Sequence, residues 1–321
     1  MNGVDIMRSL TVGTRGSELA VTQTNWVINQ LKEVVPHLEI KTKVIVTKGD
    51  LMQKSNIPLS KIGGKGLFLK EIERALLDGE IDFAVHSMKD VPAELPPGLK
   101  IGCIPIREDA RDCLISKGNQ SLDSLPSGAV IGTSSLRRQA QILAYRSDLI
   151  VESIRGNIDT RIRKMNEGSF DATVLATAGL KRLGWTEKIS ERISVDIMTP
   201  AIGQGALMIE CREQDDELGQ ILSLLHHAET AKVIAAERSF QQLFQGGCHL
   251  PIAAHGQVIE GRVRLTGMVA EPDGSKTFQG VIEGDDPVQV GRELAVQLLD
   301  QGAGIVIDSV KETIQKAVQN R

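Results

Sequence analysis

The most constraining feature of this 321-residue chain is the alternation of strand and helix patterns over its first two hundred residues. Short apolar runs such as 81–85 are typical of buried strands, and segments such as 136–145 carry apolar residues at helical spacing. This alternation predicts parallel sheets with crossover helices. Because ligands of such sheets bind at the carboxyl ends of the strands, the residues that follow each strand are the first candidates for function.

The boundaries of the expected elements follow from turn residues and periodicity. In the first part of the chain we expect strands at 10–13, 40–46, 81–85, 114–116, 130–131, 150–153 and 173–175. We expect helices there at 17–34, 66–77, 136–145, 158–166 and 177–183, and a mobile polar loop over 48–64. A different pattern begins at residue 207, with strands at 207–211, 251–259, 263–270 and 276–282 and helices at 215–225, 228–243, 288–299 and 307–318. The chain is therefore predicted to be α/β with an α+β domain at its end.

Composition excludes several classes of protein. The net charge of −4 and the pI of about 5.9 argue against a nucleic-acid-binding protein. Aromatic residues make up only 3% of the chain, so binding by rows of stacked rings is not expected. The first two thirds of the chain are slightly basic and the last third is acidic, so a cationic cleft is expected in the first two thirds.

The cysteines and the absence of apolar runs indicate the compartment. Cys103, Cys113, Cys211 and Cys248 show no CxxC spacing and no His at zinc-finger distance, which fits reduced thiols without a metal site. Residues 1–10 contain no apolar leader core, and no run is long enough to span a bilayer. We expect a soluble cytoplasmic protein that does not act at a membrane.

Three strand-to-helix junctions carry a pattern that suits anions. After the strand at 130–131, Thr133 and Ser135 stand at the start of a helix that opens with Arg137 and Arg138. Hydroxyls and free N–H groups at a helix start bind anions, and arginine grips a carboxylate or phosphate with two hydrogen bonds. The pattern recurs at 14–17 and at 155–157 with Arg161. Repeated anion sites predict a ligand with several negative groups.

Three other segments have both a functional and an ordinary interpretation. Asp90, in the segment 86–92 after a buried strand, is the best acid–base candidate, or simply a solvated turn residue. Cys248 lies in the Gly-rich turn 246–251 and is either a reactive thiol or an incidental turn cysteine. Lys61 and Lys65 belong to a Gly/Lys loop without P-loop spacing, which is either a cationic lid or a helix N-terminus.

Taken together, nine motifs in order resemble the porphobilinogen deaminase family, also called hydroxymethylbilane synthase. They cover nearly the whole chain, at residues 14–17, 63–68, 85–92, 107–112, 132–141, 155–161, 178–184, 203–206 and 246–252. The resemblance implies two sheet domains like those of periplasmic binding proteins, with crossing hinge segments, and a small C-terminal α+β domain. The implied boundaries are 1–104 with 205–224, 105–204, and 225–321.

The resemblance also implies an activity. Enzymes of the family join four porphobilinogens head to tail, release ammonia each time, and hydrolyse off the linear tetrapyrrole hydroxymethylbilane. The chain grows on a dipyrromethane primer bound covalently, as a thioether, to the cysteine that matches Cys248. Each porphobilinogen carries an acetate and a propionate, which would explain the many Arg and hydroxyl groups. The family expectation is a monomer that binds this small-molecule substrate and no nucleic acid.

Roles carry over to individual residues through the matching motifs. Asp90 would act in catalysis, hydrogen-bonding pyrrole N–H groups and stabilising the positive charge that develops as ammonia leaves. The implied primer ligands are Cys248, Ser87, Lys89, Asp90, Thr133, Ser135, Arg137, Arg138 and Gly156. The implied substrate ligands are Arg15, Ser17, Lys61, Lys65, Phe68, Arg155, Arg161, Arg182 and Gln204, and no metal is implied.

The residues alone leave another class open. Two sheet domains with anion sites also describe a non-catalytic solute-binding or effector-sensing protein. The absence of a leader and of a helix-turn-helix region weakens the transport and regulator forms of that hypothesis. An intact-mass measurement separates the two, because the primer adds two fused porphobilinogen units to the chain and a binding module does not carry them.

Overall fold

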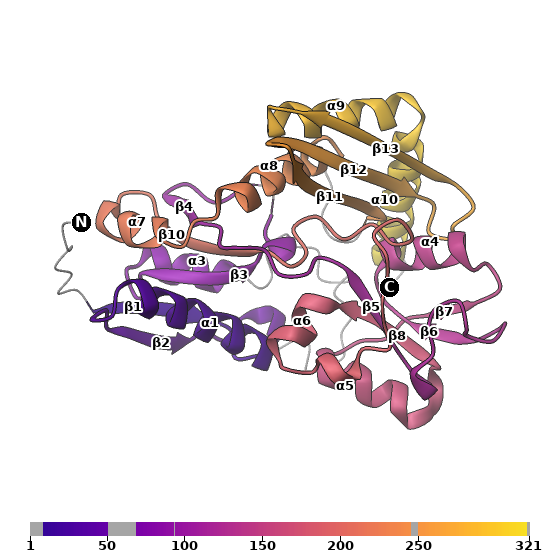
Figure 1. The fold of residues 1–321 in the computed structure, drawn as a ribbon, viewed down its shortest axis with the longest axis horizontal. Helices are drawn as coiled ribbons and strands as arrows, with labels where there is room; N and C mark the ends of the chain where they lie inside the picture. Colours follow the sequence, from indigo (N-terminus) through magenta and orange to yellow (C-terminus); the bar gives the residue numbers. More distant parts are fainter. Residues whose placement is uncertain (1–8, 51–68, 93, 245–249, 320–321) are drawn as a thin grey trace. The chain divides into compact units, whose positions relative to one another are not determined.

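The computed structural model describes residues 9–50, 69–92, 94–244 and 250–319, and the chain divides into two compact units. The first unit comprises Met1–Arg107 and Ala206–Ala231, and the second comprises Glu108–Gly205 and Lys232–Arg321. The chain therefore leaves the first unit, returns to it, and leaves it again. Figure 1 shows the elements of each unit along the sequence.

The first unit is built on a five-stranded mixed sheet with the order β2-β1-β3-β10-β4. Strand β1 is parallel to β2 and β3, whereas β10 is antiparallel to β3 and β4. The strands are β1 (Leu10–Thr14), β2 (Ile40–Val44), β3 (Phe83–Ser87), β4 (Leu99–Cys103) and β10 (Leu207–Arg212). Its helices are α1 (Glu18–Val34), α3 (Lys70–Leu77) and α7 (Asp216–Ser223).

Aliphatic side chains hold this sheet to its helices. Leu10 and Phe83 of the sheet pack with Val27 and Leu31 of α1 in one buried cluster. The spacing of Val27 and Leu31 places them on one face of the helix. Helix α1 begins after Ser17, whose hydroxyl accepts a hydrogen bond from the backbone N–H of Ala20. The start of α1 is thereby fixed directly after the end of β1.

The second unit contains another five-stranded mixed sheet, with the order β7-β6-β8-β5-β9. Strand β6 is parallel to β7 and β8, and β5 is antiparallel to β8 and β9. The strands are β5 (Asp112–Ser116), β6 (Val130–Gly132), β7 (Ile150–Glu152), β8 (Ala172–Ala176) and β9 (Glu191–Arg192). The helices are α4 (Leu136–Tyr145), α5 (Ile158–Lys164) and α6 (Thr177–Arg182).

The same unit ends in a three-stranded antiparallel meander of β11 (Ile252–Ile259), β12 (Arg262–Ala270) and β13 (Thr277–Gly284). Helix α9 (Pro287–Asp300) packs on β12 and β13, and α10 (Ala303–Gln319) packs on β12 (Figure 1). The long helix α8 (Ala228–Leu243) adds Phe240 to the buried core of this sheet. This α+β part was predicted from the change of pattern after residue 207.

The predicted fold class is confirmed, with a correction to strand direction. The alternation of elements predicted parallel sheets, but both large sheets are mixed, because β10 and β5 run against their neighbours. The short strands β4 and β9 were not predicted. The second unit holds two sheets, so a separate third domain beginning at residue 225 stays a prediction. Most of the predicted loop 48–64 lies outside the described residues. Among the helices that the structure describes, none has the length and apolar composition of a membrane span.

Candidate active site

In the first unit, the carboxyl end of β3 presents Asp90. Strand β3 runs directly into one 3-10 turn, Met88–Asp90, whose first residue is buried and donates its backbone N–H to Ala206 O at 3.0 Å. Ser87 forms a hydrogen bond of 2.9 Å with the Nε2 atom of Gln23 from α1. Lys89 is half-buried, and Asp90 is exposed. Buried Met88 and the hydrogen bond of Ser87 therefore hold the turn in place, while Asp90 is exposed to solvent.

A buried acid–imidazole pair lies beside this turn. The Nε2 atom of His86 on β3 lies 3.0 Å from Oε2 of Glu210 on β10, and both side chains are buried. Burial and the neighbouring charge of Glu210 raise the pKa of Glu73 on α3. Sequence reasoning missed Glu210 and Glu73. A charged residue inside the apolar run of β10 was the signal that could have drawn attention to Glu210.

The end of β1 brings Arg15 and Ser17 to the same edge of the sheet. Because β1 and β3 are parallel neighbours, their carboxyl ends lie at one edge, with Arg15 after β1 and Asp90 after β3. Ser17 caps α1, and the Arg15 guanidinium pairs with the carboxylate of Asp50, with Nε 3.1 Å from Oδ1. The structure thus groups five predicted site residues in this unit: Arg15, Ser17, Ser87, Lys89 and Asp90.

In the second unit, the junction between β6 and α4 has the predicted form. Thr133 is buried, and its hydroxyl accepts the backbone N–H of Ser135 at 3.2 Å. The Ser135 hydroxyl caps α4 by accepting the backbone N–H of Arg138 at 3.4 Å. Both predicted hydroxyl ligands therefore serve local structure here, which fixes where α4 begins and where its first two arginines point.

Arg137 and Arg138 converge on one buried carboxylate, that of Asp112 at the start of β5. Oδ2 of Asp112 accepts from Nη1 of Arg137 at 2.7 Å, and Oδ1 accepts from Nη2 of Arg138 at 2.8 Å. Gln204 also donates to Oδ1, at 2.9 Å. Burial alone would raise the pKa of Asp112, but the charges of the two arginines outweigh it and hold this pKa well below its ordinary value. Sequence reasoning assigned no role to Asp112.

A third arginine adds positive charge to this group. Nε of Arg161 donates to the backbone oxygen of Gly156 at 2.9 Å. Burial, with the nearby charge of Arg138, lowers the pKa of Arg161 to about 10. Within the described residues, Arg161 forms no ion pair, and Arg137 and Arg138 pair with Asp112. Three guanidinium groups and a single carboxylate leave an excess of positive charge in a largely buried place, which favours an anionic ligand.

Two other predicted residues of this unit lie just before α5 and at the end of α6. Arg155 is exposed beside Gly156, before α5. Arg182, at the end of α6, donates to the backbone oxygen of Gly205 at 2.8 Å, and burial lowers its pKa to about 10. Gly205 has a φ of +87°, and a Cβ there would lie 2.4 Å from the backbone oxygen of Glu108, so this position requires glycine.

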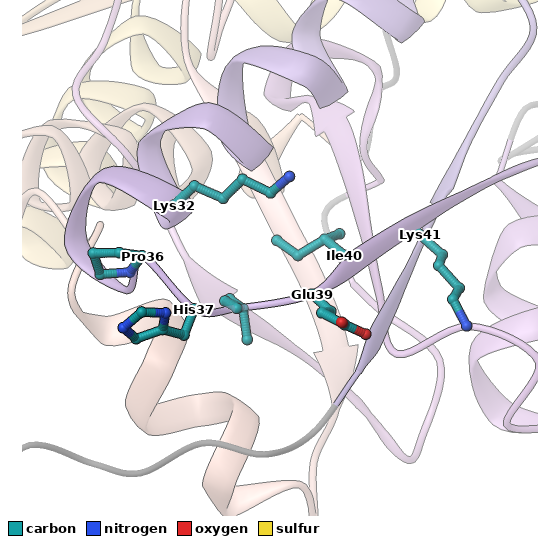
Figure 2. Close-up of a pocket in the computed structure, with 7 residues that line it drawn as sticks. Lys32, Pro36, His37, Glu39, Ile40 and Lys41 are labelled. Atoms are coloured by element: carbon teal, nitrogen blue, oxygen red, sulfur yellow. The ribbon is translucent and has the colours of Figure 1, made fainter.

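Four predicted residues lie outside the part of the chain that the structure describes, and one described hollow lies away from the site. Cys248, Lys61, Lys65 and Phe68 lie outside the described residues. An open hollow of about 420 Å³ is lined by Lys32, Pro36, His37, Leu38, Glu39, Ile40 and Lys41. Figure 2 draws these side chains. The hollow lies where β2 begins, at the opposite end of the parallel strands from Arg15, so it does not belong to the candidate site. No cluster of metal-binding side chains occurs within the described ranges.

Comparisons with known proteins agree over nearly the whole chain. Residues 10–220 match the family model "Porphobilinogen deaminase, dipyromethane cofactor binding domain", and residues 231–300 match "Porphobilinogen deaminase, C-terminal domain". Proteins named porphobilinogen deaminase from Geobacillus kaustophilus and Bacillus subtilis are 55% and 51% identical, over 96% and 97% of this chain and 99% of each relative.

A solved structure, that of the methionine-binding protein MetQ, is 12% identical, with a TM-score of 0.42 over 72% of this chain and 94% of that protein. A likeness this weak adds nothing to the topology described above. Two family models that together match most of the sequence, and relatives more than half identical over almost its full length, show that this chain belongs to the porphobilinogen deaminase family.

Proposed function

We propose that the chain joins four porphobilinogens head to tail on a dipyrromethane primer held by Cys248, releases ammonia at each addition, and hydrolyses off hydroxymethylbilane. The observation that carries the proposal is the buried carboxylate of Asp112 paired with both Arg137 and Arg138, with Arg161 as a third guanidinium near Arg138. Its positive excess matches a ligand with an acetate and a propionate on every ring. Bound dipyrromethane supplies the pyrrole on which the product chain is built.

The proposed roles divide between the two units. In the second unit, Thr133, Ser135, Arg137, Arg138 and Gly156 bind primer carboxylates. Ser87, Lys89 and Asp90 of the first unit also serve the primer. The proposed substrate ligands are Arg15, Ser17, Arg155, Arg161, Arg182 and Gln204, together with Lys61, Lys65 and Phe68.

The three described cysteines support the assignment of the thioether to Cys248. Cys103, Cys113 and Cys211 are buried, and burial raises their pKa values to about 12, 11 and 11. A thiol with so high a pKa is almost entirely protonated near neutral pH, and the thiolate is the nucleophile. These three side chains are therefore poorly suited to form a covalent bond with a ligand.

Asp90 is the proposed catalytic residue. Its carboxylate is exposed at the end of β3, on a turn fixed by buried Met88. A carboxylate in this position accepts hydrogen bonds from pyrrole N–H groups. It also offsets the positive charge that develops as the aminomethyl group of porphobilinogen leaves as ammonia. We further propose that the protein works in the cytoplasm as a monomer, without nucleic acid or membrane.

Steady-state turnover tests this function. The purified protein is expected to consume porphobilinogen and release one ammonia for each molecule consumed. Salt is expected to raise the Michaelis constant, because the carboxylate-binding arginines act by charge. Ammonia, porphobilinogen and linear tetrapyrrole are measured at low and high ionic strength. Binding of porphobilinogen without its consumption would instead identify a binding module.

A further inference from the structure

The Arg15 guanidinium, one of the proposed substrate ligands, already holds a carboxylate. Nε of Arg15 lies 3.1 Å from Oδ1 of Asp50 and 3.4 Å from Oδ2, and Nη2 also donates to Oδ1. This is a two-point grip of the kind arginine makes with a ligand carboxylate. The Nε–Nη2 edge of Arg15 is therefore occupied by a group with the same chemistry as the acetate or propionate of the proposed substrate.

Asp50 is itself fixed in the place where it meets Arg15. Its Oδ2 accepts from the hydroxyl of Thr47 at 2.7 Å and from the backbone N–H of Thr47 at 3.3 Å. Thr47 is fully buried. Burial alone would raise the pKa of Asp50, but the hydrogen bonds from Arg15 and Thr47 outweigh it and lower this pKa. Asp50 is thus an ionised, oriented carboxylate at neutral pH.

The exposure of this pair differs from that of the pairs made by Asp112. The side chains of Arg15 and Asp50 are 22% and 20% exposed, whereas those of Arg137, Arg138 and Asp112 are 5%, 7% and 0% exposed. A partly exposed ion pair is weak because water competes with it, whereas a buried one is costly to break. The Arg15–Asp50 pair can therefore open and exchange its carboxylate.

We propose that Asp50 is a positioning residue, an internal carboxylate that holds the Arg15 fork and gives way to a carboxylate of the incoming substrate. The inference rests on the proposed function, because it takes Arg15 as a substrate ligand. Exchange of one carboxylate for another leaves the Arg15 charge paired throughout. It also means that the substrate binds in competition with Asp50.

Competition predicts a separation between substrate binding and turnover. Asp50→Asn keeps the shape but removes the charge, so the Michaelis constant of the holoenzyme for porphobilinogen is expected to fall about two- to tenfold, with kcat nearly unchanged. Asp50→Glu retains a carboxylate and is expected to stay closer to wild type. In an Arg15→Gln background, Asp50→Asn is expected to change nothing further.

The matched control is Glu80→Gln, which removes a carboxylate paired with Lys43 on β2 of the same unit. It is expected to leave the Michaelis constant unchanged. A Michaelis constant that stays the same or rises in Asp50→Asn would overturn the proposal. So would an effect of Asp50→Asn that persists without Arg15.

Arginine labelling separates this inference from the proposed function. Phenylglyoxal is expected to modify Arg15 faster in Asp50→Asn than in wild type, as measured by peptide mass mapping, and Glu80→Gln is expected to leave that rate unchanged. If wild type fails to turn over porphobilinogen, the proposed function is wrong. The labelling rate still shows whether Asp50 protects Arg15 from modification. An equal labelling rate in wild type and Asp50→Asn would contradict the exchange.

Discussion

Asp90→Asn is expected to lower the turnover number of the primer-loaded protein about a hundredfold or more, the usual cost of losing one electrostatic stabiliser. The amide keeps the size of the side chain but removes the charge that offsets the developing cation. Because Asp90 is exposed and its turn is anchored by Met88, the substitution is expected to leave the fold intact. Steady-state turnover of porphobilinogen, with intact mass to confirm primer loading, measures the effect.

Two further variants sharpen this test. Asp90→Glu keeps the charge and moves it by one methylene, so it is expected to retain more activity than Asp90→Asn. Glu94→Gln removes an exposed carboxylate four residues away and is expected to turn over normally. Near-normal turnover in primer-loaded Asp90→Asn would remove Asp90 from the mechanism and direct attention to Lys89.

Asp112→Ala is expected to destabilise the protein by about 3–5 kcal/mol, the cost of leaving buried charges without their partner. The substitution would leave the buried guanidinium groups of Arg137 and Arg138 without their carboxylate partner. Urea unfolding of the purified protein measures the change in the free energy of unfolding. The control is Asp148→Asn, which removes the carboxylate of the more exposed pair with Arg146 and is expected to have a much smaller effect.

The low pKa of Asp112 also predicts how stability depends on pH. A carboxyl group whose pKa is lowered on folding stabilises the protein above its unfolded value, here about 3.8. That contribution is lost as pH falls below this value toward the folded pKa. Wild type is therefore expected to lose stability more steeply below about pH 4 than Asp112→Asn, which has no such group to protonate. If the free energy of unfolding fell equally with pH in wild type and Asp112→Asn, Asp112 would not be the ionised partner of the two arginines.

The local parts of the fold were predictable because local sequence determines them. Helix α4 begins after Ser135 and α1 after Ser17, as their caps and apolar spacing predicted. The direction of β10 was not predictable from its own residues, because it depends on the chain leaving the first unit and returning at Ala206. Strand β9 is only two residues long and has no apolar run.

The same distinction separates what could and could not be predicted about the site. The hydroxyl and arginine pattern at 133–138 marks an anion site from adjacent residues. The carboxylate partners of the site arginines are set by tertiary structure. Asp112 lies 25 residues before Arg137, and Asp50 lies 35 residues after Arg15. The roles of the predicted ligands stay predictions, although, of the fourteen that the structure describes, nine belong to the second unit and five to the first.

The central claim, that the chain builds its product on a primer attached to Cys248, is tested most directly by intact mass. Wild type is expected to exceed the mass of the bare chain by two fused porphobilinogen units, and Cys248→Ala is expected to show the bare mass and no activity. Cys103→Ala, Cys113→Ala and Cys211→Ala are the matched controls and are expected to keep the added mass. A wild-type chain without the addition, or an addition that survives Cys248→Ala, would contradict the account.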